Sequence, residues 1–162
     1  MNNRSIAGLA AFTGLLAAGA PAAAQDAGAV SFRALLKEMV ETDSSFATGD
    51  CTALVTRTAA RMQAQGFPAA NLKIFVPEGS PRSGNLVAWL PGKDPKAKAV
   101  LMLGHIDVVN AFKADWTRDP FVLVEENGQF YGRGVSDMKA QDAIWADNMV
   151  RYHAEGYQAA RG

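Results

Sequence analysis

The 162-residue sequence is poor in cysteine and histidine and has no net charge. Its single cysteine excludes an internal disulfide framework and any zinc site built from several cysteines. Its 16 basic and 16 acidic side chains balance, so nothing in the charge favours nucleic acid or an anionic membrane as a partner. What remains, with 49% hydrophobic and 20% charged residues, is the composition of a globular protein long enough for one domain.

The sequence also lacks a hydrophobic run suited to spanning a membrane. Residues 6–19 are apolar or small, but this run is short and rich in alanine. Arg4 precedes it, and the small residues 21–24 follow it, as at a signal peptidase site. We therefore interpret residues 1–24 as an export signal. The mature chain is then expected to be periplasmic or secreted, with no membrane partner after signal removal. A buried core helix is the alternative interpretation of the run.

Downstream of residue 24, hydrophobic patterning predicts alternating helices and strands. Helices are expected where apolar residues recur at three- and four-residue steps, over 32–41, 51–65 and 139–155. Strands are expected over 72–76, 85–90 and 99–104, followed by a hairpin of 121–125 with 129–131 around Asn127-Gly128. Residues 99–104 are apolar on both faces, which is typical of a central strand. This order indicates an α/β layered domain.

Two chemistry-bearing residues follow the predicted central strand directly. In an extended chain the side chains of His105 and Asp107 point to the same side. Open α/β sheets bind ligands at the carboxyl ends of their strands. Imidazole is a good zinc ligand, and a carboxylate two residues on can hold the other ring nitrogen. The alternative is a histidine that simply ends the strand in a hydrogen bond.

A second candidate group lies in the glycine-rich segment 131–139. Gly132 and Gly134 allow a sharp turn, and Asp137 stands where the loop meets the last helix. Asp137 can cap that helix or bind metal, and a carboxylate can bridge two metal ions. The two glycines also resemble half of a dinucleotide-binding loop, but the third glycine of that fingerprint is absent.

The other polar candidates have simpler interpretations. Cys51 is expected to be a buried thiol and not a nucleophile, because nothing near it in the sequence lowers its pKa. The pair Glu125-Glu126 in the hairpin is expected to be solvated. His153 lies near the end of the last helix, where it can face solvent or interact with the helix dipole.

Taken together, these segments resemble metallopeptidase family twenty, the co-catalytic zinc family of aminoacylases, glutamate carboxypeptidases and succinyl-diaminopimelate desuccinylases. The resemblance runs from about residue 31 to the last residue. It is carried by 104–109, Trp116, 119–121, 131–134 and 137–139. It implies the amino-terminal part of a three-layer α/β/α zinc-exopeptidase-like catalytic domain, with an incomplete mixed sheet. Residues 25–162 would form that part.

The resemblance also implies roles for the candidate residues. His105 would bind one zinc ion, Asp137 would bridge two, and Asp107 would be the catalytic-site acid that orients the histidine. Zinc is the implied metal, and cobalt or manganese accept the same ligands. The implied substrate is a small peptide or an N-acyl amino acid. The peptide bond between residues 137 and 138 is expected to be cis, and Asn110 stands where many relatives have proline.

Several family features have no counterpart in this sequence. No Glu-Glu pair follows Asp137, and the second histidine ligand and the dimerisation domain of full-length relatives, which are often homodimers, are missing. We therefore expect the amino-terminal portion of an exported metallohydrolase, inactive by itself, whose apolar strand edge at 100–103 promotes association. A non-catalytic periplasmic binding module derived from such an enzyme is the main alternative. A nucleotide-binding half-domain is a third hypothesis.

Overall fold

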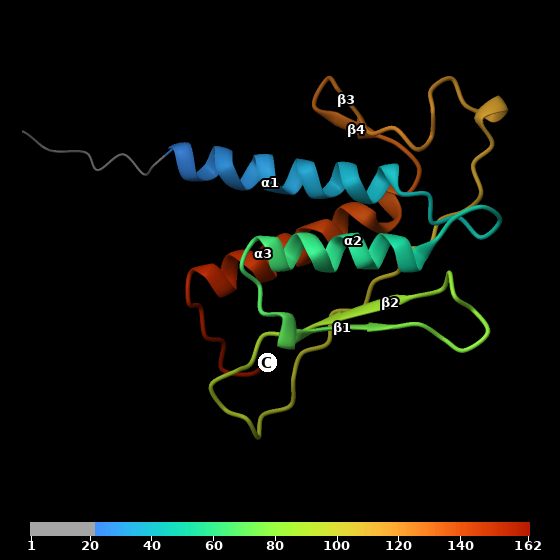
Figure 1. The fold of residues 1–162 in the computed structure, drawn as a ribbon. Helices are drawn as coiled ribbons and strands as arrows, with labels where there is room; N and C mark the ends of the chain where they lie inside the picture. The colour runs from blue at the N-terminus through green and yellow to red at the C-terminus, as the bar shows by residue number, and fades with distance from the viewer. Residues whose placement is uncertain (1–21) are drawn as a thin grey trace, which may run out of the picture.

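The computed structural model describes residues 22–162, with side chains from residue 27 onward. The predicted export signal lies, up to residue 21, outside the described residues. Three helices, α1 (Ala22–Glu41), α2 (Cys51–Ala64) and α3 (Ala140–Ala154), pack together, and two short hairpins lie on either side of them (Figure 1). None of the described helices has the length and hydrophobicity needed to cross a bilayer.

Local sequence signals explain where the helices begin and end. Asp50 caps α2, because its carboxylate accepts a hydrogen bond from the backbone N–H of Ala53 at 2.8 Å. Gly66, with φ of 91°, lies just beyond the end of the same helix, as predicted. α1 begins at Ala22, well before the apolar pattern at residue 32, since the intervening residues are rich in alanine, the best helix former.

A hydrophobic core fills the space between the three helices. Its fully buried members come mainly from α1 and α2: Leu35, Leu36, Met39, Val40, Leu54, Val55 and Met62. Ala143 and Val150 of α3 complete it, whereas Ile144, which the apolar pattern also assigns to the packed side, is 41% exposed. Each fully buried aliphatic side chain stabilises the fold by about 1.5–3 kcal/mol. The helical layer is therefore the stable part of the chain.

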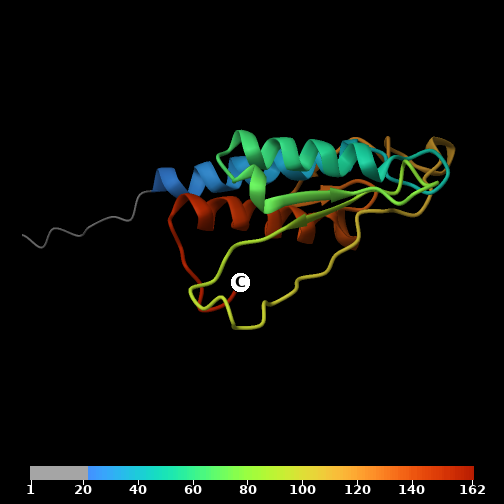
Figure 2. The same cartoon turned by 60° about the horizontal axis from the view of Figure 1, so that its bottom comes forward.

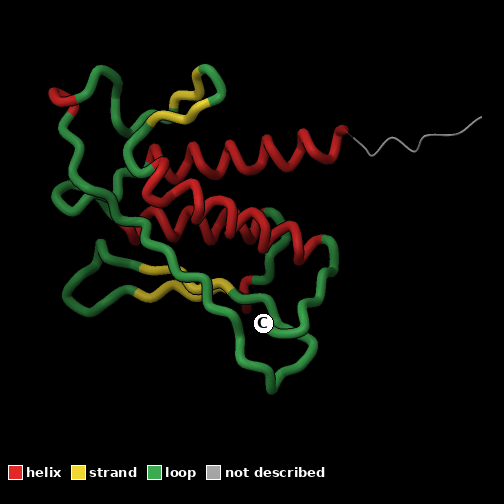
Figure 3. Tube along the Cα trace, turned by 180° about the vertical axis from the view of Figure 1, so that it is seen from behind, coloured by secondary structure: helices red, strands yellow, loops and turns green. Residues whose placement is uncertain are grey.

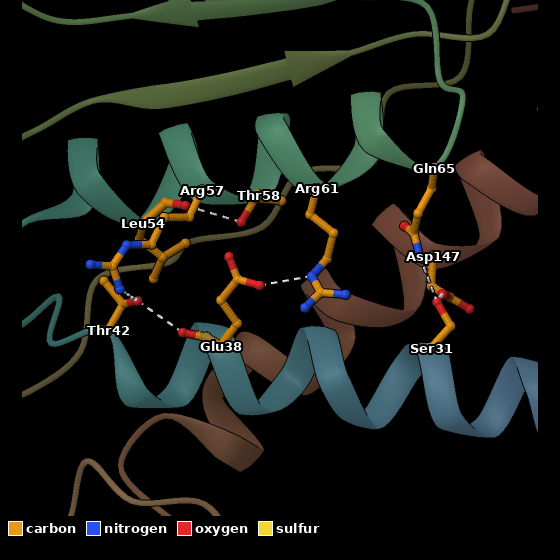
Figure 4. Close-up of polar contacts among 9 residues, drawn as sticks. All are labelled: Ser31, Glu38, Thr42, Leu54, Arg57, Thr58, Arg61, Gln65 and Asp147. Atoms are coloured by element: carbon orange, nitrogen blue, oxygen red, sulfur yellow. Dashed lines mark hydrogen bonds and ion pairs between the residues drawn. The ribbon is translucent and has the colours of Figure 1, made fainter.

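Polar contacts tie the same helices together at their surfaces (Figure 4). The hydroxyl of Ser31 on α1 donates to Asp147 on α3 at 2.7 Å and accepts from Gln65, next to the end of α2, at 2.9 Å. The guanidinium of Arg61 on α2 pairs with Glu38 on α1 at 2.7 Å. These contacts are partly exposed, so each adds little stability, but together they fix the register of the helices.

The first hairpin lies against α2 and consists of β1 (Leu72–Phe75) and β2 (Asn85–Ala88), which pair antiparallel. Both strands form where they are predicted, each one or two residues shorter. Leu72 and Leu86 pack towards the helices. On the opposite face, Phe75 and Val87 remain 46% and 45% exposed. Helices therefore cover one face of this hairpin only.

The second hairpin pairs β3 (Val124–Glu126) with β4 (Gln129–Tyr131). β4 forms where it is predicted, whereas β3 begins three residues later than predicted and extends to Glu126. Asn127 and Gly128 make its turn with φ of 53° and 74°. Positive φ at both central residues is the mark of the hairpin turn that Asn-Gly favours.

The prediction of a central strand over residues 99–104 is wrong. The segment lies within an irregular connection between β2 and β3 (Figures 2 and 3). Its apolar side chains are 55–80% exposed: Val100, Leu101, Met102 and Leu103. A strand is held by hydrogen bonds to its neighbours. Here the N–H of Val100 bonds to the carbonyl of Gly162 at 2.8 Å, and no ladder forms among the described residues.

The predicted α/β class, in incomplete form, is confirmed. Strand pairing occurs in both senses, because the two hairpins are antiparallel and an isolated bridge joins Ser45 and Val108 in parallel. Among the described residues, one helical layer and separate pieces of sheet are present.

Candidate metal site

The segment that carries His105 is held by the loop that follows α1. The hydroxyl of Ser44 donates to the carbonyl of Ile106 at 2.6 Å, and the N–H of Val108 donates to the carbonyl of Ser44 at 3.2 Å. Ser44 is buried, with 1% of its surface exposed. These bonds hold the backbone that follows His105 beside the loop, although the preceding residues form no strand.

Asn110 adds a further tie between the same two segments. Its side-chain Oδ1 accepts a hydrogen bond from the backbone N–H of Ala47 at 3.0 Å. Proline has no side-chain oxygen, so a relative with proline at this position lacks this bond. The departure from the family pattern therefore has a structural role here.

Asp137 lies in a wide helical turn, η3 (Val135–Lys139), that leads into α3. Its backbone is not helical, with φ of −141° and ψ of 92°, and the peptide bond from Asp137 to Met138 is cis, as the resemblance implies. No side-chain hydrogen bond caps η3 or α3. The capping interpretation of Asp137 is therefore wrong, and its carboxylate is 85% exposed.

Gly134 shapes the approach to this turn. Its φ of 85° lies in the left-handed region, which glycine adopts without strain. A Cβ at this position would stand 2.5 Å from Cγ1 of Val108, three residues beyond His105. The two segments can therefore approach each other closely only because a glycine stands here.

The structure brings His105 and Asp137 together across 32 residues of sequence. Nε2 of His105 lies 3.0 Å from Oδ1 of Asp137. On the other side of the ring, Nδ1 lies 3.2 Å from the backbone carbonyl of Asp107 and 3.4 Å from Oδ1 of the same residue. Asp107 thus contacts the imidazole through both its carbonyl and its carboxylate, and the carbonyl is the nearer acceptor.

Both nitrogens of the His105 ring face oxygen atoms, which decides what the site can hold. A carbonyl cannot donate, so Nδ1 must carry a proton. The lone pair of Nε2 would then face an oxygen of the Asp137 carboxylate, which is unfavourable. Either a proton on Nε2 or a metal ion between the two atoms removes this repulsion. Accordingly, the pKa of His105 is raised, first by the hydrogen bond to the carbonyl of Asp107 and also by the bond and charge of Asp137.

Imidazole nitrogen and carboxylate oxygen are the donor types of zinc sites, so the pair fits this metal. The fit is partial: no group of three or more histidine, cysteine, aspartate or glutamate side chains suited to a metal occurs in residues 22–162 as described. Structural and catalytic zinc sites use three or four protein ligands. The described residues therefore supply two ligands of a larger set.

Two charged residues beside the site were not identified from the sequence. Lys139 is completely buried, and burial lowers its pKa to about 8. Oδ2 of Asp142 is buried without a hydrogen-bond partner, and burial raises the pKa of this carboxyl to about 6. Asp142 lies against the backbone of Gly104, where a Cβ would meet its Oδ1 at 2.1 Å. On a helix, Asp142 lies on the same side as Trp145 and Met149, and this place beside apolar residues was the available signal.

The acidic pair and the second histidine lie away from the site, in agreement with the prediction. Glu125 pairs with Arg33 at 2.9 Å, and Glu126 pairs with Arg118. Both glutamates are partly exposed. His153 lies exposed in the last turn of α3.

Cys51 is half-buried at the start of α2 and has no disulfide partner. Its Sγ contacts the carbonyl of Ser44 at 3.8 Å. Burial raises the pKa of the thiol, and the charge of Asp107 adds to this effect. A raised pKa reduces the thiolate fraction, which does not favour a nucleophilic role for this thiol.

The remaining motif residues support the turn that carries Asp137. The guanidinium of Arg133 stacks on the ring of Trp116 at 4.9 Å, and the N–H of Arg133 donates to the carbonyl of Pro120 at 2.7 Å. Trp116 and Pro120 belong to the motif segment between the two halves of the site. Their contacts explain why this segment accompanies the glycine-rich turn.

Comparison with known proteins gives matches to part of the chain. Residues 101–161 match the profile of Peptidase family M20/M25/M40. Aminoacylase-1 of Sus scrofa is 35% identical over 77 residues, which are 47% of this chain and 19% of that protein. Succinyl-diaminopimelate desuccinylase of Parvibaculum lavamentivorans is 36% identical over 96 residues, or 59% of this chain and 23% of that protein.

A solved structure agrees with these matches. Human carnosine dipeptidase 1 has a TM-score of 0.60 and 27% identity, covering 81% of this chain and 30% of the dipeptidase chain. The chain thus spans less than a third of the length of each of these relatives. His105 and Asp137 both fall within the matched residues 101–161. Through this segment, the chain is similar to members of Peptidase family M20/M25/M40.

Proposed function

We propose that this chain supplies part of the metal site of a zinc-dependent hydrolase that cleaves amide bonds in small peptides or N-acyl amino acids. The observation that carries the proposal is the 3.0 Å approach of His105 Nε2 to the carboxylate of Asp137. The names of the relatives, an aminoacylase, a desuccinylase and a dipeptidase, support the substrate class. All three names refer to hydrolysis of an amide bond.

Three residues have roles in this proposal. His105 binds one zinc ion through Nε2, and Asp137 offers two carboxylate oxygens, enough to bridge two ions. Asp107 orients the ring because its backbone carbonyl accepts a hydrogen bond from the Nδ1–H of His105, which leaves the lone pair of Nε2 free for metal. Cobalt and manganese accept the same donors, so the donor types favour zinc without excluding these ions.

When bound, zinc lowers the pKa of a coordinated water towards neutrality and polarises a carbonyl oxygen. The described residues contribute by holding this charge in place. Asp107 also fixes which ring nitrogen of His105 carries the proton. With two ligands, metal affinity is expected to be weak. We therefore propose that the polypeptide does not hydrolyse substrate until further ligands and a general base are supplied.

The location and assembly of the protein are proposals as well. Arg4, the apolar residues 6–19 and the small residues 21–24 support export to the periplasm or beyond. Homodimerisation follows from the family resemblance alone. Neither proposal affects the arrangement of the site.

Zinc titration of the ¹⁵N-labelled polypeptide, followed by NMR, tests the ligand roles. We expect Zn²⁺ to shift the side-chain signals of His105 with a weak, saturable affinity and to leave those of His153 unchanged. His105→Ala should abolish this binding, and His153→Ala is the matched control because that histidine lies outside the site. Equal zinc affinity in His105→Ala and wild type would contradict the proposal.

An assay of amino-acid release from N-acyl amino acids tests the proposed inactivity separately. We expect no release by the wild-type polypeptide above the level of His105→Ala. Release above that level would show that the described ligands suffice for catalysis.

A further inference from the structure

Lys139 is unusual among the charged side chains of residues 27–162, because it is the one that is completely buried. A buried ammonium group is costly unless its protons are hydrogen-bonded. The Nζ of Lys139 donates to the backbone carbonyl of Met39 at 2.8 Å and to that of Thr42 at 3.0 Å. The side chain therefore reaches partners about one hundred residues away in sequence.

The two acceptors lie at the carboxyl end of α1. The last carbonyls of a helix have no partner within the helix, and the helix dipole places negative charge there. A buried cation at this point satisfies the carbonyls and interacts favourably with the dipole. The nearby charge of Asp43 also favours the ammonium form. Lys139 thus acts as a cap of α1 that is supplied from another part of the chain.

At its other end, Lys139 is fixed to the turn that carries Asp137. Its backbone N–H donates to the carbonyl of Gly134 at 2.9 Å. Its stem passes over Gly134, where a Cβ would stand 3.2 Å from Cδ of the lysine. Asp137 lies two residues before Lys139, so the position of its backbone is linked to that of the buried side chain.

The other half of the site is attached to the same part of the molecule. Ser44, two residues after Thr42, bonds to both Ile106 and Val108 around the segment of His105. The residues 39–45, which we term the α1 junction, therefore hold His105 through Ser44 and Asp137 through Lys139.

We infer that Lys139 is a positioning residue, which sets the distance between Asp137 and His105 by anchoring the Asp137 turn to the α1 junction. The inference rests on the proposed function only in its consequence, since a metal shared by the two residues requires this distance. Loss of the anchor should let the turn move away from the imidazole. A substitution that only destabilises the helices should therefore leave the geometry of the site unchanged, whereas a substitution of Lys139 should alter it.

NMR of the His105 side chain in ¹⁵N-labelled protein, without metal and at one fixed pH, tests the inference. Asp137→Ala defines the signals of an imidazole that has lost its carboxylate partner. We expect Lys139→Met, which keeps the stem but removes the ammonium group, to move the His105 signals towards the Asp137→Ala positions. Lys139→Gln, which retains a hydrogen-bond donor on a shorter side chain, should move them less.

Met62→Ala is the matched control, because Met62 is equally buried but packs in the core beside Phe67 and Val150. It should lower the stability and leave the His105 signals at their wild-type positions. If Lys139→Met does not fold, Lys139→Gln is compared with wild type in the same way. Wild-type His105 signals in a folded Lys139 variant would overturn the inference. Because these NMR signals are recorded without zinc and without turnover, the test of Lys139 stays valid even if the zinc titration fails.

Discussion

The helical layer and the segment 99–104 are both strongly apolar, yet they have opposite environments. In α1, Leu36 and Val40 are fully buried against α2 and α3. In the connection between β2 and β3, Leu101 and Leu103 are each 80% exposed. The helices bury each other with their own side chains and satisfy their backbones internally, whereas an extended segment needs partners on both sides.

The difference shows that hydrophobicity predicts burial only where the chain itself supplies the covering surface. A helix completes its hydrogen bonds along its own length. A strand leaves its N–H and C=O groups to be satisfied by neighbours. The stretch with the most continuous hydrophobic character is therefore among the most exposed of the described parts of the chain.

The largest expected effect compares leucines from the two regions. Leu36→Ala should lower the free energy of unfolding by about 3 kcal/mol, because it opens a cavity in the packed core. Leu103→Ala should change it by less than about 0.5 kcal/mol, since the side chain is already in water. Urea unfolding monitored by circular dichroism measures both. Equal losses would mean that residue 103 is buried in solution.

The second prediction concerns association through the exposed segment. Unpaired, apolar extended chain promotes pairing between molecules. Replacing Leu101 and Leu103 together by glutamate should weaken self-association at least about tenfold, or about 1.4 kcal/mol. Sedimentation velocity over a range of concentrations provides the measurement. Val30→Glu, at a 66% exposed position on α1, is the control; a similar loss there would point to a general effect of charge.

The third prediction concerns Asp142, which lies where the two regions meet. Its pKa is raised from 3.8 to about 6 by burial, so the folded state holds its proton more tightly than the unfolded state. The contribution of Asp142 to the free energy of unfolding is therefore fully present below about pH 4, where the carboxyl is protonated in both states. This contribution is lost as the pH rises through about 6. Asp142→Asn should remove this loss and gain roughly 1 kcal/mol at pH 7.5, after discounting for partial exposure.

Urea unfolding at pH 4 and pH 7.5 checks this effect. The asparagine variant should match wild type at the lower pH and exceed it at the higher one. Asp115→Asn, at an exposed position in η2 (Lys113–Asp115), is the control and should show no such difference. A gain of equal size at both pH values would indicate a packing effect, not loss of a buried charge.

The parts of the fold that depend on local chemistry could be predicted from the sequence. Asp50 caps α2 because its carboxylate reaches an N–H three residues on, and Asn127-Gly128 turns the hairpin because both residues accept positive φ. The approach of His105 and Asp137 was predicted from motifs whose spacing is known in a family. In each case the determining residues are adjacent in sequence or lie in a motif.

The parts that depend on distant backbone atoms could not be predicted. The carbonyls that bind Lys139 belong to Met39 and Thr42, and no side-chain pattern marks a carbonyl as available. The failure of residues 99–104 to form a strand has the same origin. Its side chains are suited to a central strand, but hydrogen-bonding neighbours decide whether one forms. The burial of Asp142 depends likewise on the backbone of Gly104.

The attachment of both halves of the site to the α1 junction has a mechanical consequence. If α1 tilts or slides as a rigid rod, Ser44 and Lys139 carry both segments with it, and the spacing between imidazole and carboxylate is unchanged. Only distortion inside the junction alters that spacing. A rigid displacement of α1 is therefore expected to leave the ligand geometry unchanged, although the side chains of His105 and Asp137 are themselves exposed.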